Sequence, residues 1–498
     1  MLEPIIKETG INDSERYLAT LSEKTFLSLW CYPNVYTDEG YSKSKNGKEL
    51  CDLLVVFENK IIIFSDKNIV FNQEKDIKVA WKRWFKKSVL ESASQLFGAE
   101  SWIKNHSDRI FLDKKCENKF PIAIPKNGLE IFLIAVTKNS SEPAKKYYDN
   151  FAKGSTGTLV QNYNMSLEQC LDNPFNISDS FPSKTFIHIL DELSLDLLIS
   201  KLDTIHDFTT YLIEKERAIR TNHLRVIHGE EDLLGYFYSN IEQDLAGRIE
   251  LPNQGSSCEY IIQEGFWDSF IKTNEYKIIE SYRKGSVHWD EMISNFSEHI
   301  LGASVYHGKE NSFESHEIAL KYMASENRLS RCHLCKSFLI KFSSVPHNAR
   351  SALVMESPQH EGRIYTFLFF PRSDGMSDSD YRECRLGAAL AYSIVVKYQN
   401  PKAKDVIVIA TETRQNKTRS EDIIAKHYDE QLSTDEKKEA RNIMKEFQIL
   451  TNTSPKKNPV NYETPYINHS KEIGRNDKCK CGSGKKFKKC CMQTMSDY

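Results

Sequence analysis

The chain has 498 residues, of which 40% are hydrophobic and 11% are aromatic. This content is sufficient for buried cores and excludes a disordered protein, and the length predicts two or three domains. With 67 basic and 69 acidic residues the net charge is −2, which restricts any nucleic-acid surface to a local basic patch.

The sequence also indicates the compartment in which the protein works. No apolar run approaches the ~20 residues that a membrane-spanning helix needs, and the first residues lack the basic and apolar regions of a signal peptide. The cysteines outside the C-terminal tail are scattered along the chain, which favours a reducing environment. We therefore expect a cytoplasmic protein without a membrane span.

The first predicted domain, residues 1–220, opens with a helix and a β-hairpin. Apolar side chains recur at helical spacing over residues 14–30. Continuous Val, Ile and Leu runs over residues 50–57 and 60–65 predict two strands that are buried on both faces.

Polar residues gather at the ends of this hairpin. Asp52 opens the first strand, and Ser65, Asp66 and Lys67 close the second. A hairpin brings the start of its first strand beside the end of its second, so these residues are expected to converge. Carboxylates beside a lysine suit metal-assisted phosphodiester hydrolysis, because the acids hold Mg²⁺ and the lysine stabilises developing charge. The plainer alternative is an ordinary exposed turn at the strand end.

This segment resembles the core of the PD-(D/E)xK nuclease superfamily, in particular its nuclease-related domain. The resemblance implies that Asp52 is the first acid, that Lys67 is the motif lysine, and that Gln95 lies on a helix behind the metal site. The sequence departs from the pattern at Ser65, which stands where the superfamily has an acid.

Three explanations of this departure stay open. Asp66 could supply the second carboxylate, or Glu49 or Glu15 could take over its role. Alternatively, the site is inactive and the fold is retained for binding. The leading hypothesis makes Asp52 and Asp66 the magnesium ligands and Lys67 the transition-state residue, with Glu49, Ser65 and Gln95 beside them.

Further elements complete an α/β, restriction-endonuclease-like domain. A helix is expected over residues 78–103, strands over 129–137 and 185–190, and then a helix capped by Ser194. One side of the first of these helices is basic and carries Lys82, Arg83, Lys86 and Lys87. This side either contacts a phosphate backbone or is the solvated face of a core helix.

Residues 221–450 predict an α+β domain whose chemistry the sequence does not reveal. Helical patterns cover residues 229–246, 263–300, 312–342 and 378–398, and strands are expected at 352–356, 363–370 and 405–410. Cys332 and Cys335 lie in a helical run without a second pair, so we interpret them as buried thiols. A polar linker is expected over residues 451–470.

The last segment, residues 471–498, predicts a small zinc knuckle. Four thiols lie as two close pairs around a Gly-Ser-Gly turn: Cys479, Cys481, Cys490 and Cys491. Such spacing suits one tetrahedral ion, and an all-sulfur shell favours zinc. The alternative is a disulfide pair or free thiols in a disordered tail.

The knuckle closely resembles the SEC-C motif, the zinc-binding motif at the C-terminus of the SecA translocation ATPase. The order Asn-Asp-x-Cys-x-Cys-Gly-Ser-Gly-Lys-Lys carries the resemblance, and Cys491 departs from it because many members have histidine there. The resemblance implies a detachable module that contacts a protein, a ribosome or nucleic acid. The chain has no Gly-x-x-x-x-Gly-Lys-Ser/Thr phosphate loop, so we do not expect a translocase.

Together these features favour a bacterial Mg²⁺-dependent nuclease that hydrolyses phosphodiester bonds in DNA or RNA. Its combination with a SEC-C tail resembles proteins of anti-phage, or antiviral, defence. The alternative is a catalytically inactive nuclease-fold protein that docks on a ribosome, a chaperone or nucleic acid. A third hypothesis makes the middle domain the enzyme and the first domain its targeting unit.

Overall fold

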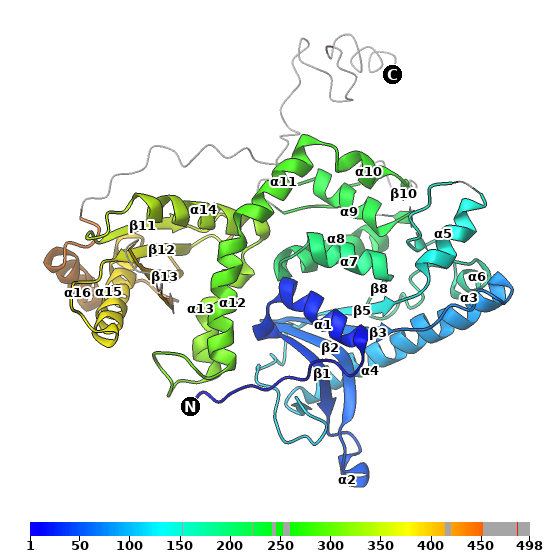
Figure 1. The fold of residues 1–498 in the computed structure, drawn as a ribbon, viewed down its shortest axis with the longest axis horizontal. Coiled ribbons are helices and arrows are strands. Elements are labelled where there is room, and N and C mark those ends of the chain that lie inside the picture. The colour runs from blue at the N-terminus through cyan, green and yellow to red at the C-terminus, as the bar shows by residue number, and fades with distance from the viewer. Residues whose placement is uncertain are drawn as a thin grey trace.

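In the computed structural model the chain is a mixed α/β protein with three sheets (Figure 1). The structure describes residues 1–151, 153–221, 223–241, 246–251, 259–413, 420–451 and 486. The body is elongated, with the sheet of β11–β13 and helices α15 and α16 at one end and helices α3, α5 and α6 at the other (Figure 1). The predicted hairpin lies in the largest sheet.

The largest sheet has six strands in the order β4-β1-β2-β3-β5-β8. Its strands are β1 (Cys31–Thr37), β2 (Lys48–Phe57), β3 (Lys60–Lys67), β4 (Ile110–Phe111), β5 (Glu130–Thr137) and β8 (Ile187–Leu190). Strands β1, β2 and β3 form an antiparallel meander, whereas β3, β5 and β8 are parallel. The predicted hairpin is confirmed, and β3 continues through Lys67.

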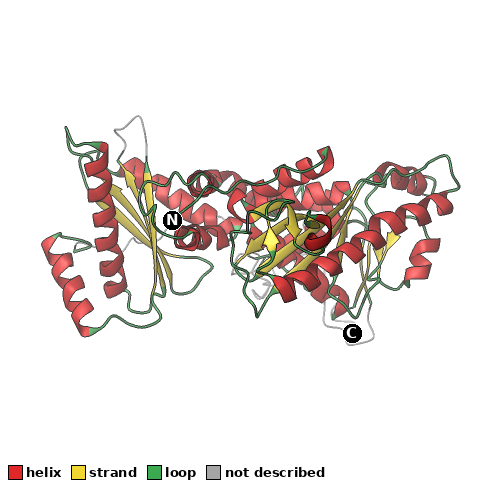
Figure 2. Ribbon diagram, turned by 90° about the horizontal axis from the view of Figure 1, so that it is seen from below, coloured by secondary structure: helices red, strands yellow, loops and turns green. Residues whose placement is uncertain are grey.

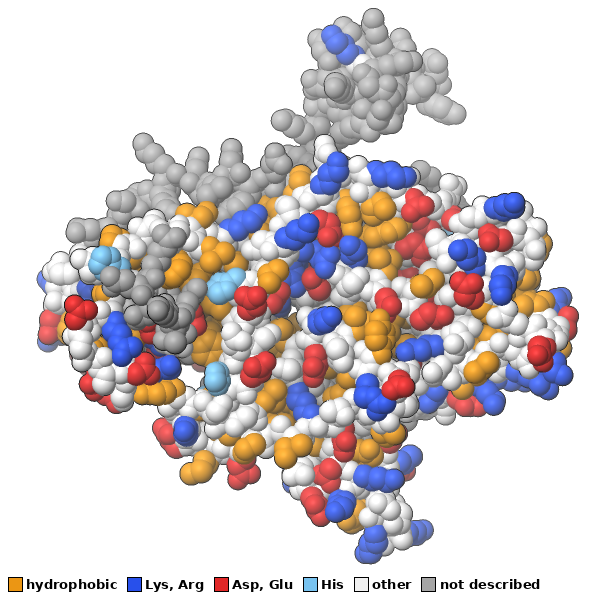
Figure 3. Space-filling model, in the orientation of Figure 1, with side chains coloured by type: hydrophobic (Ala, Val, Ile, Leu, Met, Phe, Trp, Pro, Cys, Tyr) orange, Lys and Arg blue, Asp and Glu red, His pale blue; other side chains and the backbone are white. Residues whose placement is uncertain are grey.

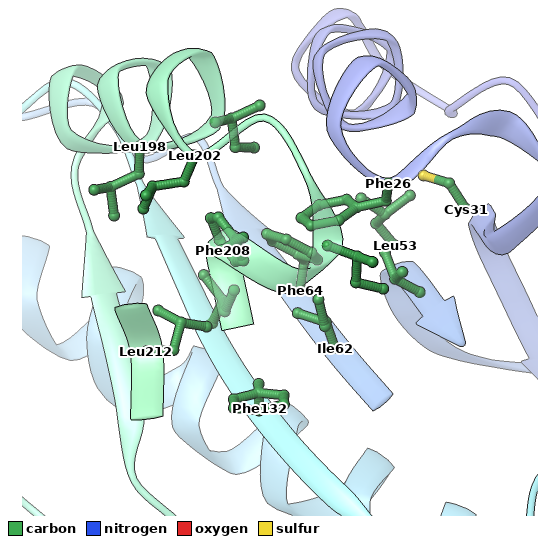
Figure 4. Close-up of a cluster of buried hydrophobic side chains, with 14 of the residues drawn as sticks. Phe26, Cys31, Leu53, Ile62, Phe64, Phe132, Leu198, Leu202, Phe208 and Leu212 are labelled. Carbon is green, nitrogen blue, oxygen red and sulfur yellow. The ribbon is translucent and has the colours of Figure 1, made fainter. Parts of the chain in front are cut away.

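Helices cover both faces of this sheet. One face packs against α1 (Asp13–Phe26), α7 (Glu192–Lys201) and α8 (Ile205–Arg220), and α4 (Glu91–His106) contacts β2, β3 and β5. Figure 4 shows Phe26 of α1, Phe64 of β3 and Phe208 of α8 in one cluster, and the ring centroid of Phe26 lies 6.0 Å from that of Phe64 and 5.1 Å from that of Phe208. Because strand side chains alternate between faces, Ser65 and Lys67 face away from this cluster, toward α4.

The predicted helix over residues 14–30 ends earlier than expected. It begins after Asn12, whose side chain accepts the Glu15 N–H at 3.0 Å, and it stops at Phe26 because Leu27 takes a positive φ of 64°. A short 3₁₀ turn, Ser28–Trp30, leads into β1. This strand was not predicted.

The helix predicted over residues 78–103 is continuous but contains a π-helical turn near its middle. It consists of α3 (Ile77–Phe85), a π-helical turn (Lys86–Leu90) and α4. Ser194 lies inside α7, and Asp191 is the cap because its side chain accepts the Ser194 N–H at 2.8 Å.

A second, four-stranded sheet joins segments on both sides of residue 220. Its order is β10-β9-β6-β7, with β6 (Val160–Asn162), β7 (Asn176–Ile177), β9 (Leu224–Ile227) and β10 (Tyr260–Ile262). Because β9 pairs with β6, the boundary predicted near residue 220 falls inside a structural unit. Two short helices, α5 (Ser141–Asp149) and α6 (Leu167–Asp172), precede and follow β6.

The middle of the chain is helical, as its apolar periodicity predicts. The helices are α9 (Glu230–Ser239), α10 (Phe266–Phe270), α11 (Asn274–Gly285), α12 (Val287–Leu301), α13 (Phe313–Ser325) and α14 (Arg328–Ser344). Cys332 and Cys335 are both buried in α14, so the prediction of buried helical thiols is confirmed.

The third sheet, in the order β11-β12-β13-β14, ends the described body. Its strands are β11 (Ser351–Glu356), β12 (Arg363–Phe370), β13 (Asp405–Glu412) and β14 (Glu421–His427), with α15 (Asp378–Gln399) and α16 (Thr434–Glu446). Helix α15 crosses between the parallel strands β12 and β13, as predicted, whereas β14 and α16 were not predicted. Figure 2 shows this sheet packed against helices at one end of the molecule.

Candidate active site

The start of β2 and the end of β3 meet at one edge of the largest sheet. Leu53 pairs with Phe64 in the register of the two strands, so Asp52 comes next to the end of β3. Its carboxylate Oδ2 accepts the backbone N–H of Asp66 at 2.5 Å. The expected convergence of Asp52 with this strand end is therefore observed.

Lys67, Ser65 and Gln95 form a hydrogen-bonded group on the α4 side of the sheet. Lys67 Nζ donates to Gln95 Oε1 at 2.8 Å, and Ser65 Oγ donates to the same oxygen at 3.0 Å. Ser65 is fully buried and also lies 3.2 Å from Ser92 Oγ of α4. The structure thus brings the predicted glutamine to the predicted lysine.

Asp66 faces the opposite side of the sheet. Its Oδ2 accepts a hydrogen bond from Ser14 Oγ of α1 and lies 3.6 Å from Lys138 Nζ. Burial raises the pKa of the Asp66 carboxyl, and the hydrogen bond from Ser14 and the charge of Lys138 oppose that shift. The structure therefore does not bring the Asp66 carboxylate to Lys67 and Gln95, because neighbouring residues of one strand point in opposite directions.

A second group of acids lies beside Asp52. Asn34 of β1 donates from Nδ2 to Glu49 Oε1 at 2.7 Å and to Glu15 Oε2 at 3.0 Å. Burial raises the pKa of the Glu49 carboxyl, the hydrogen bond from Asn34 lowers it, and the charge of Glu15 raises it further. Both glutamates were candidate site residues from the sequence, whereas Asn34 was not, because the strand that carries it was not predicted.

The charges of Lys67 and of the two glutamates all act on the pKa of the Asp52 carboxyl. Burial raises the pKa of the Asp52 carboxyl to about 7. The Asp66 N–H and the Lys67 charge oppose this shift, whereas the negative charges of Glu49 and Glu15 add to it. A carboxyl that titrates near neutral pH, beside a lysine and two further acids, is typical of a catalytic site.

The oxygen atoms of this edge fit a hard divalent cation. Carboxylate and amide oxygens are the ligands that Mg²⁺ and Ca²⁺ prefer, and thiolate or imidazole ligands, which zinc prefers, are absent from this group. The negative charges of Glu49 and Glu15, which add to the raised pKa of the Asp52 carboxyl, would be relieved by a cation. Within the described part of the chain no three His, Cys, Asp or Glu side chains already stand at metal-binding distance.

Basic side chains of α3 and of the π-helical turn after it lie beside the end of β5. Trp84 Nε1 donates to the Lys138 carbonyl at 2.9 Å, which places the end of α3 beside the residue that follows β5. Arg83, Lys86 and Lys87 are exposed there, whereas Lys82 pairs with Asp172 of α6 at 2.5 Å. On the face seen in Figure 3, acidic and basic side chains are interspersed.

The zinc-ligand predictions, Cys479, Cys481, Cys490 and Cys491, lie outside the described residues. The sequence model of one family, the SEC-C motif, matches residues 475–493 and so includes all four thiols. Comparison with curated proteins and with solved structures gives no significant match. No helix in the described ranges has both the length and the apolar character needed to cross a bilayer.

Proposed function

We propose that this protein is a divalent-metal-dependent phosphodiesterase that cleaves DNA or RNA. The observation that carries the proposal is a shared strand end: the buried Asp52 carboxyl accepts the N–H of Asp66, the residue before Lys67, and Gln95 holds the Lys67 ammonium group. Around this strand end the elements follow in the order helix, antiparallel meander, helix on the other face and parallel strand, and we propose that they form a core like that of the PD-(D/E)xK nucleases.

The second carboxylate is assigned to Glu49, supported by Glu15. Ser65 cannot ligate as a carboxylate, and the Asp66 carboxylate already accepts a hydrogen bond from Ser14 and pairs with Lys138. Asp52 and Glu49 would hold Mg²⁺, which when bound polarises the scissile phosphate and lowers the pKa of a water molecule. Under this assignment Asp66 ties the end of β3 to α1.

The remaining residues hold the ammonium group of Lys67 in place and stabilise the negative charge that develops on the phosphate. Lys67 places an ammonium group at the edge where the phosphate would bind and stabilises the negative charge that develops on it. Gln95 fixes that ammonium through its Oε1, and Ser65 fixes the Gln95 amide in turn. The exposed basic residues Arg83, Lys86 and Lys87, on α3 and the turn after it, would contact the nucleic-acid backbone beyond the site.

The tail is proposed to be a separate zinc-binding module. Four thiolates in two close pairs fit a tetrahedral, structural Zn²⁺ site, and the match to the SEC-C motif supports this assignment. Its role would be docking on a partner protein, a ribosome or nucleic acid. From the family resemblance alone, we further propose a role in anti-phage defence in the bacterial cytoplasm.

The proposal is tested by cleavage assays with the full-length protein. Supercoiled plasmid and a structured RNA are incubated with wild type, Asp52→Ala and Lys67→Ala, in Mg²⁺ and in EDTA, after circular dichroism has shown that each variant is folded. We expect Mg²⁺-dependent cleavage by wild type and its loss in both variants. Asp66→Asn is the matched control. The Asp66 carboxylate is next to Lys67 in sequence but faces α1, so this variant should retain cleavage.

The competing function is binding without catalysis, which Ser65 favours because it removes an acid from the family pattern. This alternative predicts that wild type binds nucleic acid or ribosomes tightly and turns over none of it in any divalent metal. Equal cleavage by wild type, Asp52→Ala and Lys67→Ala would also rule out the proposed site.

A further inference from the structure

Strand β11 is an open edge of the third sheet. It pairs with β12 along its whole length without a bulge and stands first in the order β11-β12-β13-β14. Residues 351–355 are half-buried, and the strand contains neither proline nor lysine. On its outer side, no backbone group has a hydrogen-bond partner among the described residues. Such an edge is a template for pairing with another strand.

The other edge strands of the described sheets are protected against such pairing. Strands β4, β7 and β10 have two or three residues, and β8 has four. Strand β14 is longer but carries the acids Glu421 and Asp422 and the basic Lys426. Short length and charged side chains both discourage the addition of a strand. Strand β11, with its Ala-Leu-Val-Met run, has neither protection.

The ladder with β12 determines which backbone groups of β11 point outward. The Ser357 N–H donates to the Arg363 carbonyl at 2.8 Å, so these two residues form a hydrogen-bonded pair. In an antiparallel ladder, hydrogen-bonded pairs alternate with pairs that are not bonded. The N–H and C=O groups of Ala352, Val354 and Glu356 therefore point to the open side.

A second copy of β11 matches this pattern of outward groups. When two such strands run antiparallel about a two-fold axis at Leu353, Ala352 of each copy lies opposite Val354 of the other. Both members of these pairs have outward groups, so about four backbone hydrogen bonds form. The half-buried Leu353 side chains of the two copies then face each other across the axis, which removes apolar surface from water.

The charges at the ends of β11 favour the same register. Arg350, just before the strand, comes opposite Glu356 of the second copy, and both side chains are exposed. Arg350 is held on the α15 side, where it donates to the Phe447 carbonyl and lies over the Tyr392 ring. Glu356 has no ion pair within the described part of the chain. Opposite charges directly across two strands stabilise their pairing.

We propose that the protein forms a symmetric dimer in which β11 pairs with β11 of a second copy. The pairing joins the two four-stranded sheets into one continuous sheet, and the same strand serves both subunits, as a two-fold interface requires. This inference is independent of the proposed nuclease, because none of its residues belongs to the candidate active site.

The test is sedimentation velocity of the full-length, zinc-loaded protein over a concentration series from about 1 to 100 µM. We expect a wild-type dimer. Arg350→Glu and Glu356→Arg should each weaken it at least about tenfold, because like charges then meet at both ends of the paired strands. The double variant restores opposite charges and should regain nearly the wild-type affinity. Glu361→Arg, which makes the same charge change on the exposed loop before β12, is the matched control and should dimerise as wild type.

A backbone variant tests the hydrogen bonds of the pairing. Val354→Pro removes an outward N–H and leaves the inward groups of the ladder in place, so it should be a monomer with the wild-type circular dichroism spectrum. If it does not fold, the charge exchange decides the matter. A wild type that stays monomeric overturns the proposal, even if β11 then pairs with an extended peptide of another protein. A dimer that is unaffected by Val354→Pro and by both charge reversals overturns it as well.

Discussion

The buried carboxyl of Asp52 should destabilise the metal-free protein in a pH-dependent way. Its pKa is about 7 in the folded protein, against an ordinary value of 3.8, so the folded state binds the proton more tightly than the unfolded state does. The contribution of Asp52 to stability is therefore greatest at low pH and is lost as the pH rises from about 4 to about 7. Asp52→Asn removes this titration while keeping an oxygen that can accept the Asp66 N–H.

The magnitude follows from the size of the pKa shift. Each pKa unit corresponds to about 1.4 kcal/mol, so a shift of roughly three units costs the folded wild type about 4 kcal/mol at pH 8. At pH 5 the folded carboxyl is already largely protonated, and the cost falls to about 1.5 kcal/mol. Asp52→Asn should therefore gain about 2–3 kcal/mol more stability at pH 8 than at pH 5.

The assay is urea unfolding of wild type and Asp52→Asn in EDTA at pH 5 and pH 8, followed by tryptophan fluorescence. Glu74→Gln, which replaces an exposed acid, is the control and should show no pH-dependent gain. If the stability of Asp52→Asn relative to wild type is the same at both pH values, or falls with rising pH, the reasoning about Asp52 is refuted.

Three further predictions concern other parts of the protein. Gln95→Ala should slow cleavage by about 10-fold to 100-fold, because a hydrogen bond to the charged Lys67 is lost, with the Mg²⁺ requirement unchanged in a titration. Lys215→Met should destabilise the protein by about 3–5 kcal/mol in urea unfolding, because it removes the cation that pairs with the buried Glu230 carboxylate and leaves only the hydrogen bonds from Gln161 and Tyr211; Lys215 and Glu230 are 2.6 Å apart and each side chain is 1% exposed. Cys491→Ser should remove one zinc per chain in a colorimetric zinc assay and leave the melting temperature of the body unchanged.

Each of these predictions has a control or a contradicting result. Gln95→Glu keeps an acceptor for Lys67 and should retain more activity than Gln95→Ala; equal rates would contradict the positioning role. Adding Glu230→Gln to Lys215→Met should recover part of the lost stability, because the isolated charge is removed. A Cys491→Ser protein that still holds zinc would show that the four-thiol assignment is wrong.

The hairpin was predictable from the sequence because its strands are continuous apolar runs. Strand β1 was not, because Pro33 and Asn34 interrupt its apolar pattern and proline is rare inside sheets. The second sheet escaped prediction for a related reason: its strands are two to four residues long, too short for alternation to be recognised. Its strands also come from both sides of residue 220, so the domain boundary could not be read from composition.

The site was only partly predictable from the sequence, because the side of the sheet to which a side chain points depends on its position in the strand. The residue types at the end of β3 suggested that Asp66 could replace the acid missing at Ser65. The alternation of side chains along a strand instead sends Asp66 to Ser14 and Lys138. That the acids near Asp52 include Glu15, brought in by the first helix, follows from tertiary packing that no local pattern encodes.

The most direct test of the account is a crystal structure of the full-length protein soaked in Mn²⁺, with anomalous scattering used to locate the ion. The account predicts an anomalous peak beside Asp52 and Glu49, on the edge that Lys67 faces, with manganese–oxygen distances of about 2.1–2.2 Å to carboxylate oxygens. A peak that involves Asp66 on the α1 side instead, or no peak at this edge at saturating Mn²⁺, would contradict it.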